Sequence, residues 1–220
     1  MRRRWLGLCL FGVGCATGQA ATAKTAPPLV DVMQVAPSVV VDLRYATAQN
    51  FTGQVLYPKS ARCYLRADVA QALALVASDL GKAGLRLKLW DCYRPHRVQY
   101  QLWDIVHDER YVANPHKGSR HNRGAAVDLT LVDAQGQELV MPTPFDDFGE
   151  KAHRDYQKLP KEVIQNRAKL EQAMVQAGFS GMPTEWWHFD FGRWQGYPLD
   201  DISFDVLAQP QAKPQTAPAQ

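Results

Sequence analysis

Two short segments hold most of the residues that could carry out chemistry. They cover residues 119–128 and 185–190, and together they offer two histidines and one aspartate as metal ligands, with a glutamate to spare. Nitrogen and oxygen donors of these types bind zinc in catalytic sites, where three protein ligands leave one coordination position open. His121, Asp128 and His188 would fill the three places. These residue types therefore predict a zinc site with an open position for water.

The spacing of the first two ligands requires a break in regular structure. His121 and Asp128 are seven residues apart, and residues at that separation point to opposite faces of a regular strand. We therefore expect His121 to lie in a loop before the strand that carries Asp128. Gly124, between them, supplies the freedom to bend because glycine tolerates backbone angles that other residues avoid.

A similar irregularity is needed in the second segment. Glu185 lies three residues before His188, so it would be the general base beside a metal ligand. Residues three apart also point to opposite faces of a regular strand, so we expect a β-bulge near Trp186 and Trp187. Core packing is expected for at least one of these two tryptophans.

Each of these residues also has an ordinary interpretation when it is taken alone. A single histidine is more often a surface or core residue than a ligand, Asp128 could cap a turn, and Glu185 could be a solvated charge. The zinc motif HExxH is absent. The remaining histidines are interpreted as ordinary residues: His96, His107, His116 and His153.

Several motifs resemble a known family as a set. The pattern Ser119-x-His121-x-x-Gly124-x-Ala126-x-Asp128, followed by Glu185-x-x-His188, resembles the signature of zinc D,D-peptidases that act on peptidoglycan-type peptides. Within that group, three segments resemble the D-alanyl-D-alanine dipeptidases of the VanX type: Asp91 to Pro95, Phe145 to Phe148 and Glu185 to Phe189. The resemblance runs from about residue 29 to about residue 203.

The resemblance implies a role for each matched residue. It implies one zinc ion per chain, on His121, Asp128 and His188. It implies that Glu185 is the catalytic base and later the proton donor, and that Arg94 stabilises the oxyanion. It implies that Ser119 contacts the substrate. Zinc lowers the pKa of water toward about 7 in such sites, and losing an oxyanion donor costs about 100- to 1000-fold in rate.

Three functions fit these residues. The first is hydrolysis of the dipeptide D-Ala-D-Ala to two D-alanines, which the segments at 91–95 and 145–148 favour. The second is a D,D-carboxypeptidase that trims longer peptidoglycan peptides with the same ligands and base. The third is a non-catalytic zinc-binding module, which would be expected to lack Glu185 or Arg94; both are present.

Alternating and helical patterns predict the elements that must position these residues. Strands are predicted at 39–43, 85–89, 127–131, 138–141 and 186–191, with a turn at 133–137 before the fourth. Helices are predicted at 66–83, at 161–177 and from Pro95 onward, the last carrying Val98, Leu102 and Ile105. This mixture predicts an α+β fold with a small antiparallel sheet flanked by helices. The resemblance implies the same, as a zinc D,D-peptidase (hedgehog/D-Ala-D-Ala peptidase-like) fold.

The two ends of the chain are predicted to lie outside the fold. Residues 1–23 have the arginines, short apolar run and small residues of a signal peptide, and the run is too short to span a membrane. Residues 24–28 are interpreted as a linker, 29–207 as the catalytic domain and 208–220 as a disordered Pro/Gln-rich tail. Cys15 follows a sequence like a lipoprotein cleavage box and is a candidate lipid anchor.

The predicted export of the protein affects the expected state of its cysteines. Cys63 and Cys92 remain in the mature domain, and an oxidising compartment favours a disulfide between them. Two buried free thiols are the alternative. A disulfide at Cys92 would brace the turn that carries Arg94. We expect an exported, extracytoplasmic protein, in which salvage of D-alanine or cell-wall metabolism is favoured over glycopeptide resistance.

Composition excludes other classes of function. The chain has 220 residues, of which 46% are hydrophobic and 21% charged, and its formal net charge is +3. This charge is too small to indicate a nucleic-acid partner. Three of the 25 basic residues are Arg2, Arg3 and Arg4, and removing them leaves 22 basic against 22 acidic residues. The mature domain is thus formally neutral, and its partner is expected to be a small D,D-dipeptide. The oligomeric state stays open.

Overall fold

The computed structural model describes residues 26–209. The predicted leader at 1–23, with Cys15, lies outside the described residues, as does most of the predicted tail at 208–220. Within the described part, the first strand begins at Leu29 and the last helix ends at Leu207. None of the helices in residues 26–209 is long and apolar enough to cross a membrane.

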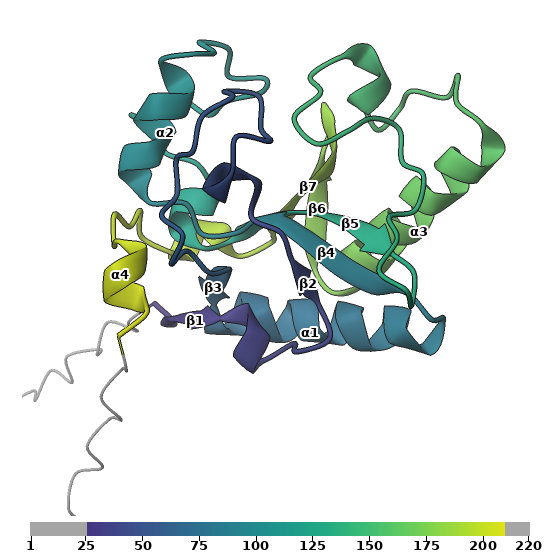
Figure 1. The fold of residues 1–220 in the computed structure, drawn as a ribbon, viewed down its shortest axis with the longest axis horizontal. Helices are drawn as coiled ribbons and strands as arrows, with labels where there is room; N and C mark the ends of the chain where they lie inside the picture. Colours follow the sequence, from purple (N-terminus) through teal and green to yellow (C-terminus); the bar gives the residue numbers. More distant parts are fainter. Residues whose placement is uncertain (1–25, 210–220) are drawn as a thin grey trace, which may run out of the picture.

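A five-stranded sheet forms the centre of the fold (Figure 1), in the order β2-β4-β5-β7-β6. Its strands are β2 (Val40–Val41), β4 (Arg86–Asp91), β5 (Ala126–Val132), β7 (Glu185–Phe191) and β6 (Phe179–Met182). β4, β5, β7 and β6 pair antiparallel, whereas the short edge strand β2 runs parallel to β4. The predicted antiparallel sheet is therefore correct for four strands, and β2 is the exception. A second, two-stranded sheet pairs β1 (Leu29–Asp31) with β3 (Tyr64–Arg66).

Two long helices lie against the sheet, as predicted. α1 (Ala67–Lys82) and α3 (Lys161–Gln176) pack against each other and against the sheet. α1 buries Val69, Leu73, Val76 and Leu80, the residues whose helical spacing predicted it. The shorter helices are α2 (His96–Trp103) and α4 (Phe204–Leu207). Single turns of 3₁₀ helix complete the chain: η1 (Val32–Gln34), η2 (Arg44–Ala46), η3 (His121–Arg123), η4 (Glu150–Ala152) and η5 (Trp194–Gly196).

Three predicted elements are wrong in extent. Of the strand predicted at 39–43, only Val40–Val41 forms β2. The return strand at 138–141 is reduced to a single bridge between Val132 and Glu138, because Pro142 and Pro144 cannot donate hydrogen bonds to a continued ladder. Ile105 lies beyond the end of α2 and is 45% exposed, although its spacing placed it on the helix. The turn at 133–137 forms as predicted, with the Asp133 N–H donating to the Gln137 carbonyl at 2.9 Å.

Candidate metal centre

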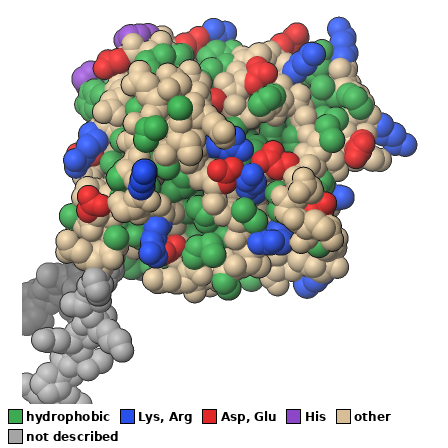
Figure 2. Space-filling view, viewed as in Figure 1, with side chains coloured by type: hydrophobic (Ala, Val, Ile, Leu, Met, Phe, Trp, Pro, Cys, Tyr) green, Lys and Arg blue, Asp and Glu red, His purple; other side chains and the backbone are tan. Residues whose placement is uncertain are grey.

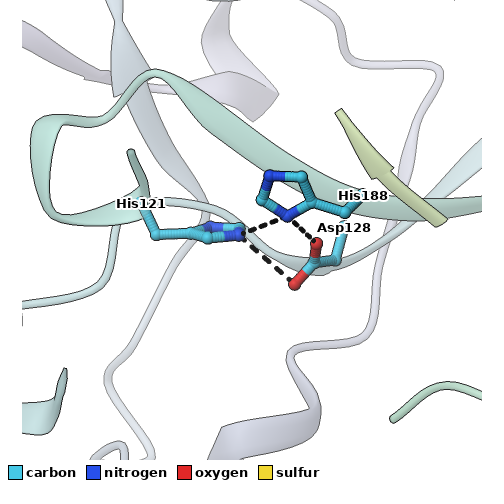
Figure 3. Close-up of side chains that lie close together, drawn as sticks. All are labelled: His121, Asp128 and His188. Carbon is cyan, nitrogen blue, oxygen red and sulfur yellow. Dashed lines mark hydrogen bonds and ion pairs between the residues drawn. The ribbon is translucent and has the colours of Figure 1, made fainter. Parts of the chain in front are cut away.

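Three predicted ligands meet at the middle of the sheet (Figure 3). Asp128 on β5 is the direct partner of His188 on β7, and η3 brings His121 alongside them. His188 Nδ1 lies 2.9 Å from Asp128 Oδ1, and His121 Nε2 lies 3.2 Å from His188 Nδ1 and 3.4 Å from Asp128 Oδ2. All three side chains are buried. In the part of the chain that the structure describes, this is the one group with metal-ligand geometry.

The orientation of the two imidazoles fits a cation between them. His121 Nδ1 lies 2.7 Å from the Cys92 carbonyl, and His188 Nε2 lies 2.9 Å from Asp190 Oδ1. Each acceptor holds a proton on the nitrogen that faces it, His121 Nδ1 or His188 Nε2, which we call the outer nitrogen. The other nitrogen of each ring, His121 Nε2 or His188 Nδ1, then presents a lone pair toward Asp128. Two facing lone pairs beside a carboxylate repel unless a proton or a metal ion lies between them. This donor set is the one that zinc takes in catalytic sites.

The charges of the group are strongly coupled. Burial alone would raise the pKa of Asp128, but His121 and His188 lower it well below its usual range. Burial alone would lower the pKa of His188, but Asp190 and Asp128 raise it well above its usual range. With no metal ion bound, the two shifts favour a proton on His188 beside the charged Asp128 carboxylate, and a bound metal ion would take the place of that proton.

The predicted loop and bend before Asp128 are present. His121 begins the turn η3, and Gly124 ends it with a backbone φ of 65°. A Cβ atom at Gly124 would lie 2.3 Å from Leu29 Cδ2, so a larger residue fits neither the conformation nor the space. Glycine is therefore what allows His121 to turn back toward Asp128.

The predicted bulge on β7 is also present. The register between β6 and β7 shifts between Gly181 and Met182, opposite residues 186–188. The extra residues let Glu185 and His188 face the same site, with 4.0 Å between Glu185 Oε2 and His188 Nδ1. Arg154 holds this irregular segment by donating to the Met182 carbonyl at 2.9 Å and to the His188 carbonyl at 2.7 Å.

Glu185 has the environment of a general base. Its Oε1 atom is buried and has no hydrogen-bond partner within residues 26–209. Burial raises the pKa of Glu185 to about 8; Asp128 adds to this shift and His188 opposes it. A carboxyl group with a pKa close to neutral can both accept and return a proton.

Arg94 lies in the same pocket, fixed by two partners. Its Nε and Nη2 donate to Asp91 Oδ2 at 3.0 and 2.6 Å, and its Nη1 donates to Gln99 Oε1 at 2.9 Å. Burial opposes its charge, but Asp91 more than offsets this and raises the pKa of Arg94. Three of five N–H groups are thus occupied, and one on each terminal nitrogen remains for a ligand.

The pocket around these groups is a small cavity of about 60 Å³. Ser119 lines it, with its Oγ accepting the His121 N–H at 3.2 Å. Asp146 lines it from the loop after β5, and its Oδ2 accepts the Phe51 N–H at 3.2 Å. Tyr111 and Phe148 stack at 4.9 Å on another part of its wall.

Asp146 is unusual in two respects. Its φ of 62° is the one left-handed backbone among the non-glycine residues of 26–209, a costly conformation that is found at functional sites. Burial, and then the charge of Asp128, raises the pKa of its carboxyl to about 8. Its Oδ1 accepts a hydrogen bond from the Tyr45 hydroxyl at 3.4 Å.

The cysteines and the remaining histidines lie outside the ligand group. Cys63 and Cys92 form a buried disulfide with 5.3 Å between their Cα atoms, and Cys92 precedes the turn to Arg94. His96 Nε2 lies 2.7 Å from the Pro115 carbonyl. His107, His116 and His153 take no part in the ligand group.

Sequence reasoning missed the residues that hold the site in place: Asp91, Asp146, Arg154 and Asp190. Asp190 could have been found, since residues two apart on a strand share a face and it follows His188 at that spacing. Asp91, three residues before Arg94, also lay inside a quoted motif. No sequence pattern indicated the role of Arg154, because it donates to the backbone carbonyls of Met182 and His188, which are far from it in the sequence.

Comparison with known proteins gives the same name for a family model and for the sequence relatives. A family model described as D-ala-D-ala dipeptidase matches residues 25–207. A protein of Escherichia coli K12 named D-alanyl-D-alanine dipeptidase is 38% identical over 83% of this chain and 94% of its own length. One of Enterococcus faecium with the same name is 32% identical over 75% of this chain and 91% of its own. A solved structure of the vancomycin-resistance D,D-pentapeptidase VanY in complex with Zn(II) overlaps with a TM-score of 0.42 at 15% identity, covering 62% of this chain and 77% of that one.

Proposed function

The chain belongs to the D-Ala-D-Ala dipeptidase family, and we propose that its pocket performs the zinc-dependent hydrolysis of D-Ala-D-Ala to two D-alanines. His121, Asp128 and His188 would hold one zinc ion, through His121 Nε2, an Asp128 carboxylate oxygen and His188 Nδ1. A zinc ion bound there supplies Lewis acidity, which activates water and polarises a carbonyl group. The chain's own residues position the substrate and move the protons.

Glu185 and Arg94 have separate tasks in this reaction. Glu185 takes a proton from the attacking water as the new C–O bond forms, and returns it to the amine nitrogen as the C–N bond breaks. The two unoccupied N–H groups of Arg94 face the negative charge that develops on the carbonyl oxygen. Because Asp91 and Gln99 already fix the guanidinium, little reorganisation is needed when that charge appears.

The carboxyl of Asp146, a partly exposed residue that lines the catalytic pocket, is the observation that carries the choice of a dipeptide. The pocket is lined by Asp128, Asp146 and Glu185. Its other charged residues already have partners: Arg94 pairs with Asp91, Arg120 with Asp190 and Glu109 with Lys117. A divalent metal ion offsets part of this surplus of negative charge. Asp146 then remains as the partner for a further cation, and the free amino group of a dipeptide is such a cation. A longer peptide has an uncharged amide at that position.

Measuring the cleavage of two substrates side by side, a free dipeptide and an N-blocked tripeptide, tests this choice. We expect the zinc-loaded protein to cleave D-Ala-D-Ala much faster than an N-acetylated tripeptide ending in D-Ala-D-Ala, and a chelator to abolish the reaction. Faster cleavage of the blocked tripeptide would replace the dipeptidase with a D,D-carboxypeptidase. Turnover that persists in a fully metal-free sample would overturn both assignments.

We also propose that the enzyme acts outside the cytoplasm, in salvage of D-alanine or metabolism of peptidoglycan peptides. The positively charged start followed by an apolar run supports export, with Cys15 as a candidate lipid anchor. The Cys63–Cys92 disulfide adds support, since disulfides persist in oxidising compartments. Fractionation of cells that express the full chain tests this, and recovery of the uncleaved chain in the cytoplasm would contradict it. Replacing Cys15 with Ser separates lipid anchoring from soluble export.

A further inference from the structure

Arg154 joins the two ends of the segment that carries the general base, and the reaction proposed above gives it no task. Its Nε donates to the Met182 carbonyl at 2.9 Å, and its Nη2 donates to the His188 carbonyl at 2.7 Å. Its backbone N–H also donates to the Pro183 carbonyl at 2.9 Å. Met182 lies three residues before Glu185, and His188 lies three residues after it. One arginine therefore closes this segment into a loop with the base at its centre.

The segment needs this support because the sheet is irregular there. The register between β6 and β7 shifts between Gly181 and Met182, so residues 186–188 bulge out of the ladder. His188 lies in this bulge, and its carbonyl accepts the Arg154 Nη2–H. The guanidinium therefore stabilises the chain at the place where the pairing of the strands is interrupted.

The guanidinium of Arg154 is closely packed. A Cβ atom at Gly181 would lie 2.2 Å from both the Cζ and the Nε of Arg154, so an alanine there would displace the guanidinium. The centroid of the Phe189 ring lies 4.3 Å from Arg154 Cζ, which is a cation–π distance. The Arg154 side chain is 10% exposed. A glycine, an aromatic ring and two carbonyls thus fix the plane of the guanidinium.

The charge of Arg154 makes this arrangement costly. Elsewhere, Arg44 and Lys88 each contact two carboxylates at distances between 2.9 and 3.5 Å, and Figure 2 shows basic and acidic side chains close together in the region of β2 and β4. Arg154 instead directs its hydrogen bonds to carbonyls, and its Nη1 lies 3.6 Å from a carboxylate oxygen of Glu171. A nearly buried cation costs free energy unless it is closely paired. This cost indicates that Arg154 does more than fill space.

We propose that Arg154 is a positioning residue that sets the distance between the general base Glu185 and the metal ligand His188. The inference rests on the proposed function, in which these two residues act at one site. The rigid fork of arginine reaches two acceptors at once, which a lysine ammonium does not reproduce. Arg154 lies outside the lining of the catalytic pocket, so it acts through the backbone of 182–188 and does not touch the substrate. Misplacing a catalytic group by about 1 Å can cost about 100-fold in rate.

Arg154→Ala in the full chain tests the proposal with two readouts. At saturating zinc, kcat for D-Ala-D-Ala should fall by about 10- to 100-fold, whereas KM should change little because the substrate contacts remain. The zinc affinity, measured by competition with a chelator, should fall by about 10-fold because the backbone of His188 loses its anchor. The second readout does not depend on turnover.

Chemical rescue distinguishes positioning from a general loss of structure. Ethylguanidinium corresponds to the part of the side chain that Arg154→Ala removes, and it should restore both kcat and zinc affinity in a saturable way. Ethylammonium carries the same charge without the fork and should restore neither. Gly181→Ala displaces the guanidinium without removing it, so it should lower both quantities and should not respond to ethylguanidinium. Arg86→Ala is the matched control: Arg86 Nε also donates to a carbonyl, that of Ser38 at 2.8 Å, but from the start of β4, and both quantities should stay unchanged.

Three results would overturn the proposal. The first is an Arg154→Ala variant with unchanged kcat and zinc affinity. The second is equal recovery with ethylammonium, which would assign the effect to charge alone. The third is no recovery in a variant that a circular dichroism melt shows to be folded. If Arg154→Ala does not fold, Gly181→Ala provides the same comparison. If the unaltered protein does not cleave D-Ala-D-Ala, the proposed function fails, and the zinc affinities with and without ethylguanidinium still decide the role of Arg154.

Discussion

The two sides of the catalytic pocket are positioned by different kinds of structure. On the metal side, Asp128 and His188 are direct partners on neighbouring strands, so the sheet register fixes the distance between them. On the side that faces the amino end of the substrate, Asp146 stands on a loop with a left-handed backbone. A strand pair tolerates little displacement, whereas a loop can vary without disturbing the core. The sheet therefore fixes the position of the metal ligands, whereas a loop positions the residue that would select the substrate.

The largest expected effect on kcat is at the metal side, where one substitution should largely abolish catalysis without loss of the zinc ion. Glu185→Gln keeps the size of the side chain but removes the base, so kcat should fall by about 100- to 10,000-fold. The zinc content should stay at one per chain, because the three ligands are untouched. Turnover of D-Ala-D-Ala together with metal analysis measures both quantities. Activity near that of the unaltered protein would mean that another group accepts the proton.

The next largest effect lies at the loop side and should appear in KM. Asp146→Asn removes the charge that would face the substrate's ammonium, and kcat/KM for D-Ala-D-Ala should fall by about 100-fold, as for other buried charge pairs. An N-acetylated dipeptide lacks that ammonium, so its slow cleavage should change little. Equal losses on both substrates would show that Asp146 supports the pocket without recognising the amino group. Asp147→Asn, at the exposed neighbouring residue, is the matched control.

A smaller effect is expected from the residue that orients one ligand. Asp190 Oδ1 accepts the outer N–H of His188, and Asp190→Asn should weaken zinc binding by about 10- to 100-fold. A competition titration with a chelator measures this affinity directly. At saturating zinc, kcat should recover most of its value, which distinguishes a positioning residue from a catalytic one. An unchanged zinc affinity would show that the strand alone orients His188.

The sequence predicted the metal side of this comparison better than the loop side. The residue pattern at 127–131 predicted the strand with Asp128, and the geometry that the ligands must satisfy predicted the bend at Gly124 and the bulge near Trp186. These inferences were possible because each concerns residues that are close together in the sequence, within 121–128 or within 185–188. In contrast, Asp146 meets Phe51 from 95 residues away, and nothing in either local pattern indicates that contact. The strand predicted at 138–141 was wrong for a local reason, since Pro142 and Pro144 follow it and cannot donate hydrogen bonds to a continued ladder.

The pH dependence of kcat/KM should also reflect the protonation of Asp146 on the loop side of the pocket. Burial raises the pKa of Asp146 to about 8, so in the free enzyme its carboxyl is protonated at lower pH and cannot attract an ammonium group. Loss of the Asp146 charge should lower kcat/KM by up to about 10-fold per unit as the pH drops below that value, in addition to the loss of the basic form of Glu185, whose pKa is also raised to about 8. In Asp146→Asn this limb should become less steep, because the amide does not titrate and only Glu185 still does. A limb that persists unchanged in the variant would assign the titration to a different group.

The smallest effect on turnover is expected from the disulfide, which tests how firmly the metal side is held. The Cys92 carbonyl accepts the His121 Nδ1–H at 2.7 Å, and Cys92 also precedes the turn to Arg94. Replacing Cys63 and Cys92 with alanine should lower the free energy of unfolding by about 2–4 kcal/mol. The carbonyl belongs to the backbone and β4 still pairs with β5, so kcat at saturating zinc should change by less than about 3-fold, which corresponds to less than one weak hydrogen bond. Denaturant unfolding and steady-state kinetics on the same variant measure the two quantities. A large fall in kcat with zinc bound would show that the sheet alone does not hold Arg94 and His121, and that the disulfide is part of what positions them.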